Sequence, residues 1–283
     1  MAPPSQYATL SKETRTHAKP LTLTQALDAF VLDCRARRLS PRTVEFYQQK
    51  LSRFLKWCEE RDCLTLADIT TARLRAFLVW LQEQGHSPGG QHAYARALRA
   101  WFYFLTAEGA ISESPMQRVK MPKVPKIPPL GLSVHEVKDL LDAADIERDK
   151  AMILCLVDTG ARLSEFAALN VGDVDMSTGA VTLRKTKGGK TRIVYLGHGA
   201  LRVLRRYLRR RQDLVTPDSP LWVSLHRPQE GRRLGTSGIR LALRRIGLRA
   251  GVRHHNPHTF RRTFAIWSLR AGMNIYALRE LMG

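Results

Sequence analysis

Residues 180–196 read AVTLRKTKGGKTRIVYL, and this stretch decides the fold class. Apolar and polar residues alternate in 180–184 and again in 191–196, which is the period of a β-strand. The residues between them, 185–190, are rich in lysine and glycine and predict the turn of a hairpin. Helical spacing of apolar residues holds before this stretch and resumes after it, in a helix expected at 199–212. The sequence therefore predicts a mainly α-helical protein with a small β-sheet in its second domain.

A histidine and an arginine stand three residues apart in the segment 258–265. If this segment is helical, His258 and Arg261 lie on one face, because residues i and i+3 of a helix are neighbours. An imidazole and a guanidinium placed in this way can address one phosphate together. The spacing therefore predicts a phosphate site on this segment. Along the chain, the segment stands after a basic helix expected at 237–251 and before a last short helix at 275–282.

The segment before the hairpin predicts where the second domain begins. Ser133 and Glu136 form a capping-box pattern, so a helix is expected to begin after Ser133. Asp149 is expected to open the next helix, which is apolar. A short helix follows at 161–169, with Arg162 in its first turn beside the floor of the expected site.

The first half of the chain predicts a small helical bundle over residues 21–112, where apolar side chains repeat at helical spacing. Thr22 or Thr24 is expected to cap the first helix. Ser40, followed by Pro41, is expected to cap the second. Two independently packed regions follow from this, joined by a proline- and lysine-rich segment that favours an extended backbone. The expected organisation is a mobile tail (1–20), a helical domain (21–112), a linker (113–132) and a mixed α+β domain (133–283).

The charge of the chain predicts a polyanionic partner. Its 46 Lys and Arg residues against 25 Asp and Glu give a net charge of +21 and an isoelectric point near 10.6. Nucleic acid fits better than a membrane, because no apolar run of about 18 residues and no signal peptide is present. A turn rich in glycine is also expected at 85–90, before the fourth helix of the bundle.

The four cysteines show neither C-x-x-C spacing nor histidines at zinc-ligand intervals. They are therefore expected to be free and mostly buried thiols in a reducing cytosol, with no metal site. They are Cys34, Cys58, Cys63 and Cys155.

Basic side chains on the expected helices, linker and hairpin predict a surface that follows DNA phosphates. Such contacts position a protein and supply salt-dependent affinity without reading sequence. Solvated helix faces remain the alternative interpretation for each residue taken alone. The candidates are Arg42, Lys50, Arg53, Arg96, Arg99, Lys123, Lys126, Lys190, Arg192 and Arg240.

Four motifs stand in an order that resembles the tyrosine recombinases, the lambda-integrase-like family that includes Xer recombinases and phage and transposon integrases. The likeness runs from about Leu21 to the last residue. The motifs are Thr159-Gly160-Ala161-Arg162-Leu163-Ser164-Glu165, the hairpin around Lys187-Gly188-Gly189-Lys190-Thr191-Arg192, His258-Thr259-Phe260-Arg261, and Leu281-Met282-Gly283.

The resemblance implies a helical core-binding domain of the SAM-like type and a mixed catalytic domain, which together form a C-shaped clamp on duplex DNA. It implies site-specific strand cleavage and rejoining through a 3′-phosphotyrosyl link, without a metal or other cofactor. Arg162 and Arg261 would grip the non-bridging oxygens of the scissile phosphate, and Glu165 would support them. Lys187 would protonate the 5′-oxygen, with Lys185 and Lys190 as competitors for that role. His258 would transfer a proton near the nucleophile.

The sequence departs from the family after Leu281-Met282-Gly283, where a second histidine or tryptophan and then the nucleophilic tyrosine are expected. Tyr195 and Tyr207 belong to the hairpin and the basic helix, and Tyr276 is expected to be half-buried on the last helix. The expectation is a recombinase shortened at its C-terminus that binds DNA without cleaving it. Its self-association on DNA, as a dimer or tetramer, would be weakened by loss of the C-terminal helix that docks on a neighbour.

Two other functions compete with this interpretation. One is a non-catalytic DNA-binding regulator or accessory factor of the same family, in which the clamp residues serve as phosphate anchors. The other is an RNA-binding basic protein, although the exposed aromatic motifs of common RNA modules are missing. A cytoplasmic location associated with the nucleoid follows from the resemblance. The recognised DNA sequence does not follow from it.

Overall fold

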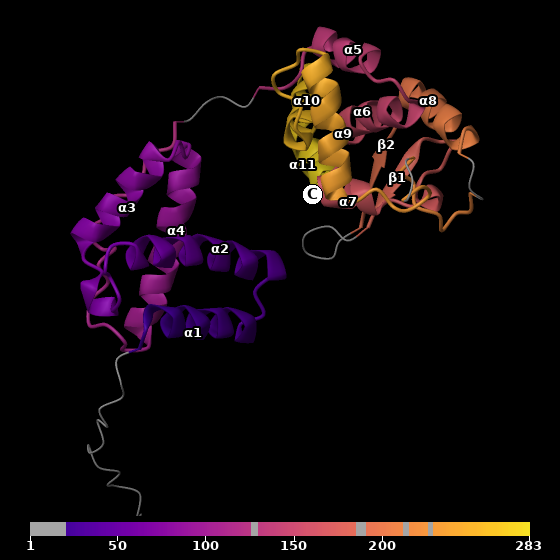
Figure 1. The fold of residues 1–283 in the computed structure, drawn as a ribbon. Helices are drawn as coiled ribbons and strands as arrows, with labels where there is room; N and C mark the ends of the chain where they lie inside the picture. Colours follow the sequence, from indigo (N-terminus) through magenta and orange to yellow (C-terminus); the bar gives the residue numbers. More distant parts are fainter. Residues whose placement is uncertain (1–20, 126–129, 185–190, 212–214, 226–228) are drawn as a thin grey trace, which may run out of the picture. The chain divides into compact units, whose positions relative to one another are not determined.

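The computed structural model describes residues 21–125, 130–184, 191–211, 215–225 and 229–283. The chain divides into two compact units, one within residues 1–127 and the other within residues 128–283 (Figure 1). Each unit has its own hydrophobic core. No helix of the described residues is long and apolar enough to cross a membrane.

Local capping signals set the helix starts of the first unit. Thr22 and Gln25 form a capping box, so of the two expected candidates Thr22, and not Thr24, caps the first helix. The Ser40 side chain accepts from the Thr43 amide, and Pro41 takes the first helical position, as predicted. The helices are α1 (Leu23–Ala36), α2 (Pro41–Glu59), the 3-10 turn η1 (Leu66–Asp68), α3 (Thr71–Glu83) and α4 (Pro88–Ala107).

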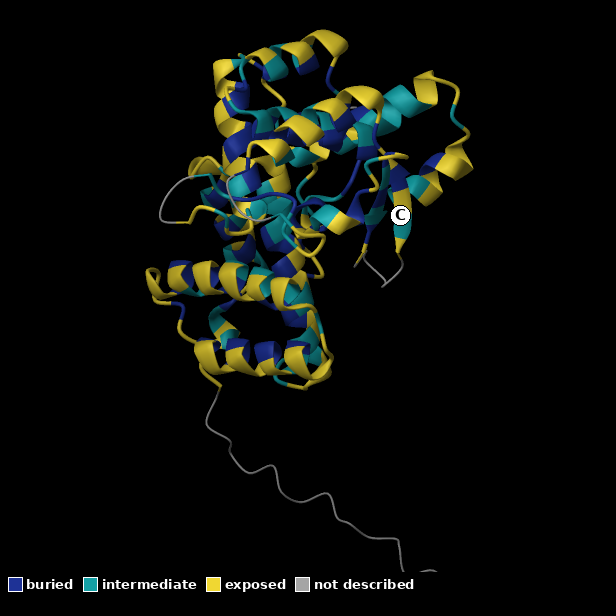
Figure 2. Cartoon of the chain, turned by 90° about the vertical axis from the view of Figure 1, so that its right-hand side faces the viewer, coloured by how far each residue is buried: buried dark blue, intermediate teal, exposed yellow. Residues whose placement is uncertain are grey.

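Aromatic side chains fill the core of the first unit. The outward faces of its helices are exposed (Figure 2). Trp101 on α4 is fully buried and donates its indole N–H to the Ala26 carbonyl of α1 (3.2 Å). Met116 and Val119 from the segment after α4 are buried in the same core. The first part of the proline-rich segment therefore packs on the helical unit.

The second unit begins as predicted, with a capping box between Ser133 and Glu136. The helix α6 is its centre and packs against both α8 and α10. The helices are α5 (Val134–Asp142), α6 (Glu147–Thr159), α7 (Leu163–Ala168), the 3-10 turn η2 (Val171–Asp173), α8 (His198–Arg209), α9 (Thr236–Arg249), α10 (Pro257–Arg270) and α11 (Ile275–Met282).

The hairpin strands β1 (Ala180–Leu183) and β2 (Arg192–Tyr195) pair antiparallel, with Leu183 opposite Arg192. The predicted mainly helical fold with a small sheet in the second domain is confirmed. Both strands are shorter than their expected ranges of 180–184 and 191–196.

Two expected boundaries are wrong. The helix expected to open at Asp149 begins at Glu147, with Ile146 as N-cap, so Asp149 lies within its first turn and is buried. The turn expected at 85–90 extends only to Ser87, because Ser87 caps α4 and Pro88 takes its first position. Gly89 and Gly90 therefore lie in the first helical turn.

Candidate active site

The left-handed turn at Gly160 lies between the two arginines of the candidate site, because it contacts Arg261 and leads along the chain to Arg162. Gly160 ends α6 with φ 55°, and a Cβ there would lie 2.4 Å from Cδ1 of Phe264 on α10. Only glycine fits both the backbone conformation and this close approach. The Gly160 carbonyl accepts from Nη1 of Arg261 (2.7 Å), and the chain then enters Arg162, the N-cap of α7.

The helix α10 carries His258 and Arg261 one turn apart. Asn256 caps this helix by accepting from the Thr259 amide. His258 is exposed on the first turn, and Arg261 is partly buried on the second. The pKa of Arg261 is lowered to about 10 by burial and by repulsion from Arg162 and Arg192. Three guanidiniums thus lie close enough to raise the local positive potential together.

Glu165 is the buried carboxylate at the centre of this cluster. It is 4% exposed and accepts from the Arg162 backbone N–H at Oε2 (3.0 Å) and from Nη1 of Arg162 at Oε1 (2.9 Å). Burial alone would raise its pKa, but the hydrogen bonds from Arg192 and Arg162 outweigh burial and hold the pKa below the usual glutamate range. Glu165 is therefore an ionised anchor for the arginines.

Arg192, the first residue of β2, binds the same carboxylate through a bidentate contact. Its Nη1 and Nη2 donate to Oε1 and Oε2 of Glu165 (3.0 and 2.6 Å). The Arg192 side chain is 9% exposed. Although the sequence assigned Arg192 to the DNA surface, its side chain is largely buried and its guanidinium is bound to Glu165.

The carboxyl end of α11 closes one side of the cluster. The Leu281 carbonyl accepts from Nε of Arg192 (2.8 Å), and the Met282 carbonyl from Nη2 of Arg261 (2.6 Å). The Gly283 carbonyl accepts from Nη2 of Arg162. Carbonyls in the last turn of a helix lack intrahelical partners, so cationic side chains stabilise them. These contacts bring Arg261 and Arg162 to adjacent residues at the end of α11, Met282 and its C-cap Gly283.

The lysines predicted to act as general acid, Lys185, Lys187 and Lys190, lie outside the described residues. The strand before them is held by Arg184, whose Nε lies 2.7 Å from Oδ1 of the buried Asp173.

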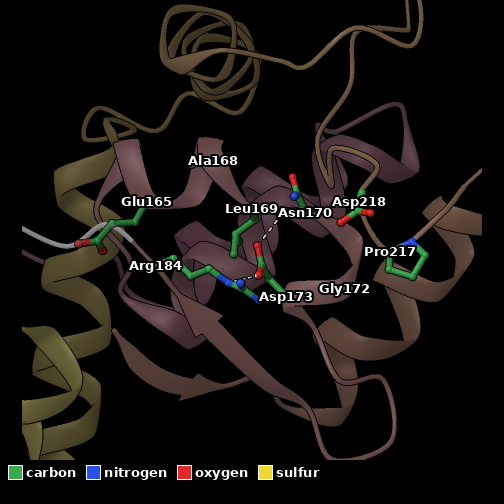
Figure 3. Close-up of a pocket in the computed structure, with 9 residues that line it drawn as sticks. All are labelled: Glu165, Ala168, Leu169, Asn170, Gly172, Asp173, Arg184, Pro217 and Asp218. Carbon is green, nitrogen blue, oxygen red and sulfur yellow. Dashed lines mark hydrogen bonds and ion pairs between the residues drawn. The ribbon is translucent and has the colours of Figure 1, made fainter. Parts of the chain in front are cut away.

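Figure 3 shows this ion pair in a pocket of about 300 Å³. The Glu165 side chain extends away from the pair (Figure 3). Both ends of the hairpin are thus attached to buried carboxylates, Asp173 through Arg184 and Glu165 through Arg192.

The predicted DNA-contacting residues divide by environment. Lys50 and Arg53 lie over aromatic rings of the first unit, Nζ of Lys50 at 4.3 Å from the Tyr94 ring centre and Cζ of Arg53 at 5.3 Å from that of Trp80. Lys126 and Lys190 are outside the described residues. Exposed on the surface are Arg42, Arg53, Arg96, Arg99, Lys123 and Arg240.

Tyrosines of the second unit occupy three different environments. Tyr207 is buried and stacks on Trp222 (ring centres 5.9 Å apart), whereas Tyr195 is exposed on β2. Tyr276, expected to be half-buried, is 68% exposed, because it projects from a helix whose buried residue is Leu278.

The alternation of β2 contained a signal that would have placed Arg192. Side chains two apart on a strand share a face, and Arg192 is two residues before the buried Val194. Ile193 and Tyr195, on the other face, are 50% and 60% exposed. The Arg184–Asp173 pair was also missed, because no local pattern joins a 3-10 turn to a strand end.

The four cysteines are buried and free, as predicted. Among the described residues, no three His, Cys, Asp or Glu side chains gather as a metal site. The described residues of this site offer a ligand guanidinium N–H donors and the exposed imidazole of His258.

Comparison with known proteins places the chain in one family. Residues 131–283 match the phage integrase family, and residues 26–108 match the phage integrase N-terminal SAM-like domain. The tyrosine recombinase XerC of Pseudomonas fluorescens is 31% identical over 265 residues, which cover 92% of this chain and 87% of the relative. The tyrosine recombinase XerA of Pyrococcus furiosus is 33% identical over 261 residues, covering 92% and 85%.

Solved structures share the fold. A lambda integrase dimer bound to a COC′ core site superposes with a TM-score of 0.74 at 19% identity, covering 93% of this chain and 95% of that one. The Tn1549 transposon integrase in complex with transposon right end DNA gives 0.72 at 17% identity, covering 93% and 91%. With relatives above 30% identity over most of its length, the chain belongs to the phage integrase family, the site-specific tyrosine recombinases.

Proposed function

We propose that the chain binds duplex DNA at a recombination site and holds one backbone phosphate between Arg162 and Arg261. The observation that supports this most is the convergence of two arginines, about a hundred residues apart in sequence, on one end of α11. Each guanidinium donates two N–H groups within the protein, from Arg162 to Glu165 and Gly283 and from Arg261 to Gly160 and Met282. A guanidinium has five N–H donors, so both retain others for phosphate oxygens.

The arginine pair suits the transition state of phosphoryl transfer. Negative charge grows on the non-bridging oxygens as the attacking oxygen approaches phosphorus, and guanidinium forks stabilise that charge. Because the forks are already oriented by Glu165 and Gly160, little reorganisation is needed when the charge develops.

Proton transfers complete the proposed reaction. An attacking tyrosine hydroxyl forms the new bond to phosphorus and gives up its proton, for which the exposed imidazole of His258 is the acceptor. The bond to the 5′-oxygen breaks, and Lys187 supplies the proton that this oxygen takes. The energy of the broken bond is kept in the phosphotyrosyl link, so a second strand can be joined without a cofactor.

We expect the polypeptide 1–283 to bind DNA without cleaving it, because Tyr195, Tyr207 and Tyr276 lie in β2, α8 and α11 and none of them belongs to the arginine cluster. The test is incubation with a nicked suicide duplex, whose short cleaved strand diffuses away and traps any covalent complex. The expected result is binding with no adduct in denaturing gels. A robust adduct mapped to Tyr276 would contradict this expectation.

The partners follow from charge and from the fold neighbours. Lambda integrase with this fold is described as a dimer on a core site and as a tetramer on a Holliday junction. We therefore expect this protein to self-associate on duplex DNA, with the exposed basic residues of both units following the phosphates. Competition between duplex DNA and structured RNA tests the class of nucleic acid, and preference for RNA would exclude the recombination site as ligand.

A further inference from the structure

Arg192 is a largely buried arginine whose position no role in phosphate contact explains. It follows the lysine hairpin directly, yet its side chain is 9% exposed and lies on the same strand face as Val194. A buried guanidinium requires internal partners to offset its desolvation. Its partners therefore indicate what it does.

Three donors of Arg192 are used inside the protein. Nη1 and Nη2 bind both oxygens of Glu165, and Nε binds the Leu281 carbonyl. The bidentate geometry fixes both the position and the plane of the carboxylate, which a lysine ammonium cannot do. Arg192 thereby sets the orientation of Glu165.

Glu165 in turn holds Arg162 at two points. Oε2 accepts from its backbone N–H, and Oε1 from its Nη1. Without Arg192 the carboxylate would be free to rotate and to take a second N–H from Arg162. The Arg162 fork would then turn toward Glu165 and away from the phosphate.

We propose that Arg192 is a positioning residue, which orients Arg162 through Glu165 and does not itself contact DNA. Because Arg192 binds both the Glu165 carboxylate and the Leu281 carbonyl, it also attaches the end of α11 to this site. This inference rests on the proposed phosphate clamp. It places one guanidinium at the junction of the hairpin, the arginine site and the last helix. Repulsion from Arg192 also contributes to the lowered pKa of Arg261, in agreement with this central place.

The experiment begins by finding the clamped phosphate. A tight-binding duplex is selected from a random pool with the full chain, and each phosphate near its centre is replaced singly by an uncharged methylphosphonate. The clamped phosphate is the position where neutralisation weakens binding about tenfold or more, and where Arg162→Met abolishes that penalty. If no position meets both criteria, the clamp itself is refuted, and the role of Arg192 falls with it.

Arg192→Met and Arg192→Lys are then compared on the native and the neutralised duplex. If Arg192 is a positioning residue, both variants should lose most of the binding penalty that neutralising the clamped phosphate causes. The reason is that neither side chain can form the bidentate contact with Glu165. Positioning also predicts that both bind the neutralised duplex as tightly as the parent does, with the same salt slope. A direct phosphate contact predicts instead that lysine preserves affinity, and that methionine weakens binding to both duplexes. Either of these results would overturn the proposal.

Three further variants separate positioning from loss of folding. Arg192→Met leaves the buried Glu165 carboxylate without its bidentate partner. The double variant Arg192→Met with Glu165→Gln removes this unpaired buried charge as well. Positioning through Glu165 predicts that this double variant loses no more of the penalty than Glu165→Gln alone. Losses that simply add would contradict it. Arg249→Met, which breaks a surface pair with Asp145, should leave the penalty unchanged.

Discussion

The basic residues on the helix faces of the first unit and those in the arginine cluster of the second unit differ in what surrounds them. In the helical unit, Arg53, Arg96 and Arg99 are exposed on the outer faces of helices. In the second unit, Arg192 and Arg261 are wholly or partly buried and bound to carboxylate or carbonyl oxygens. Exposed charges attract DNA with an affinity that falls as salt screens them. Internal charges are held by their partners in one geometry. We infer that the exposed basic residues contribute affinity for DNA, and that the arginines held by internal partners take part in the chemistry.

Removing the buried carboxylate should break the internal site most severely. Glu165→Ala leaves Arg192 and Arg162 without their anionic partner, and breaking a buried ion pair costs about 3 kcal/mol. Urea unfolding of the purified chain measures this loss. Asp145→Ala is the matched control, since Asp145 is 70% exposed in its pair with Arg249, and a change within about 0.5 kcal/mol is expected. Equal losses in the two variants would refute the distinction between internal and surface pairs.

Gly160→Ala should come next in size. The substitution combines a left-handed backbone with a clash against Phe264, for an expected loss of about 2 kcal/mol. Gly251→Ala is the control, because Gly251 has φ 66° but no atom within 4 Å of an added Cβ. Backbone strain alone predicts about 1 kcal/mol there. Thermal unfolding of both variants measures which substitution lowers the stability more. A loss of stability in Gly251→Ala as large as that in Gly160→Ala would show that the close approach of α10 to Gly160 is unimportant.

Acid should weaken the internal site once the pH falls below the ordinary glutamate pKa. Because the folded-state pKa of Glu165 is lowered, its stabilisation is present above the ordinary glutamate pKa and is lost as the pH falls through the folded value. The stability difference between the parent and Glu165→Gln should therefore shrink from pH 7 toward pH 3. Unfolding curves over this range measure the difference. A gap that stays constant with pH would mean that the charge of Glu165 does not matter.

Substitution of an exposed arginine should have the smallest effect, and only on DNA binding. Arg53→Met removes one expected phosphate contact, so the slope of log K against log salt should become shallower by about 0.9. Stability should stay within about 0.5 kcal/mol of the parent. Fluorescence anisotropy at several salt concentrations gives the slope. An unchanged slope would place Arg53 on a solvated face away from DNA.

Local patterns in the sequence predicted much of the fold. The caps at Thr22, Ser40 and Ser133 and the hairpin were found because capping and alternation depend on neighbouring residues. The arginine cluster was partly predicted, with Arg162 and Glu165 identified together through a motif. The place of Arg192 was not predicted, because a bidentate contact with Glu165, 27 positions earlier, depends on how a strand lies against a helix start.

The most direct measurement of the central claim is the methylphosphonate scan carried out with Arg162→Met and Arg261→Met side by side. Two guanidiniums on one phosphate predict one backbone position at which neutralisation weakens the parent about tenfold or more. Both variants should lose the penalty at that same position and keep the smaller penalties elsewhere. Penalties that disappear at two different positions, or at none, would show that Arg162 and Arg261 do not share a phosphate.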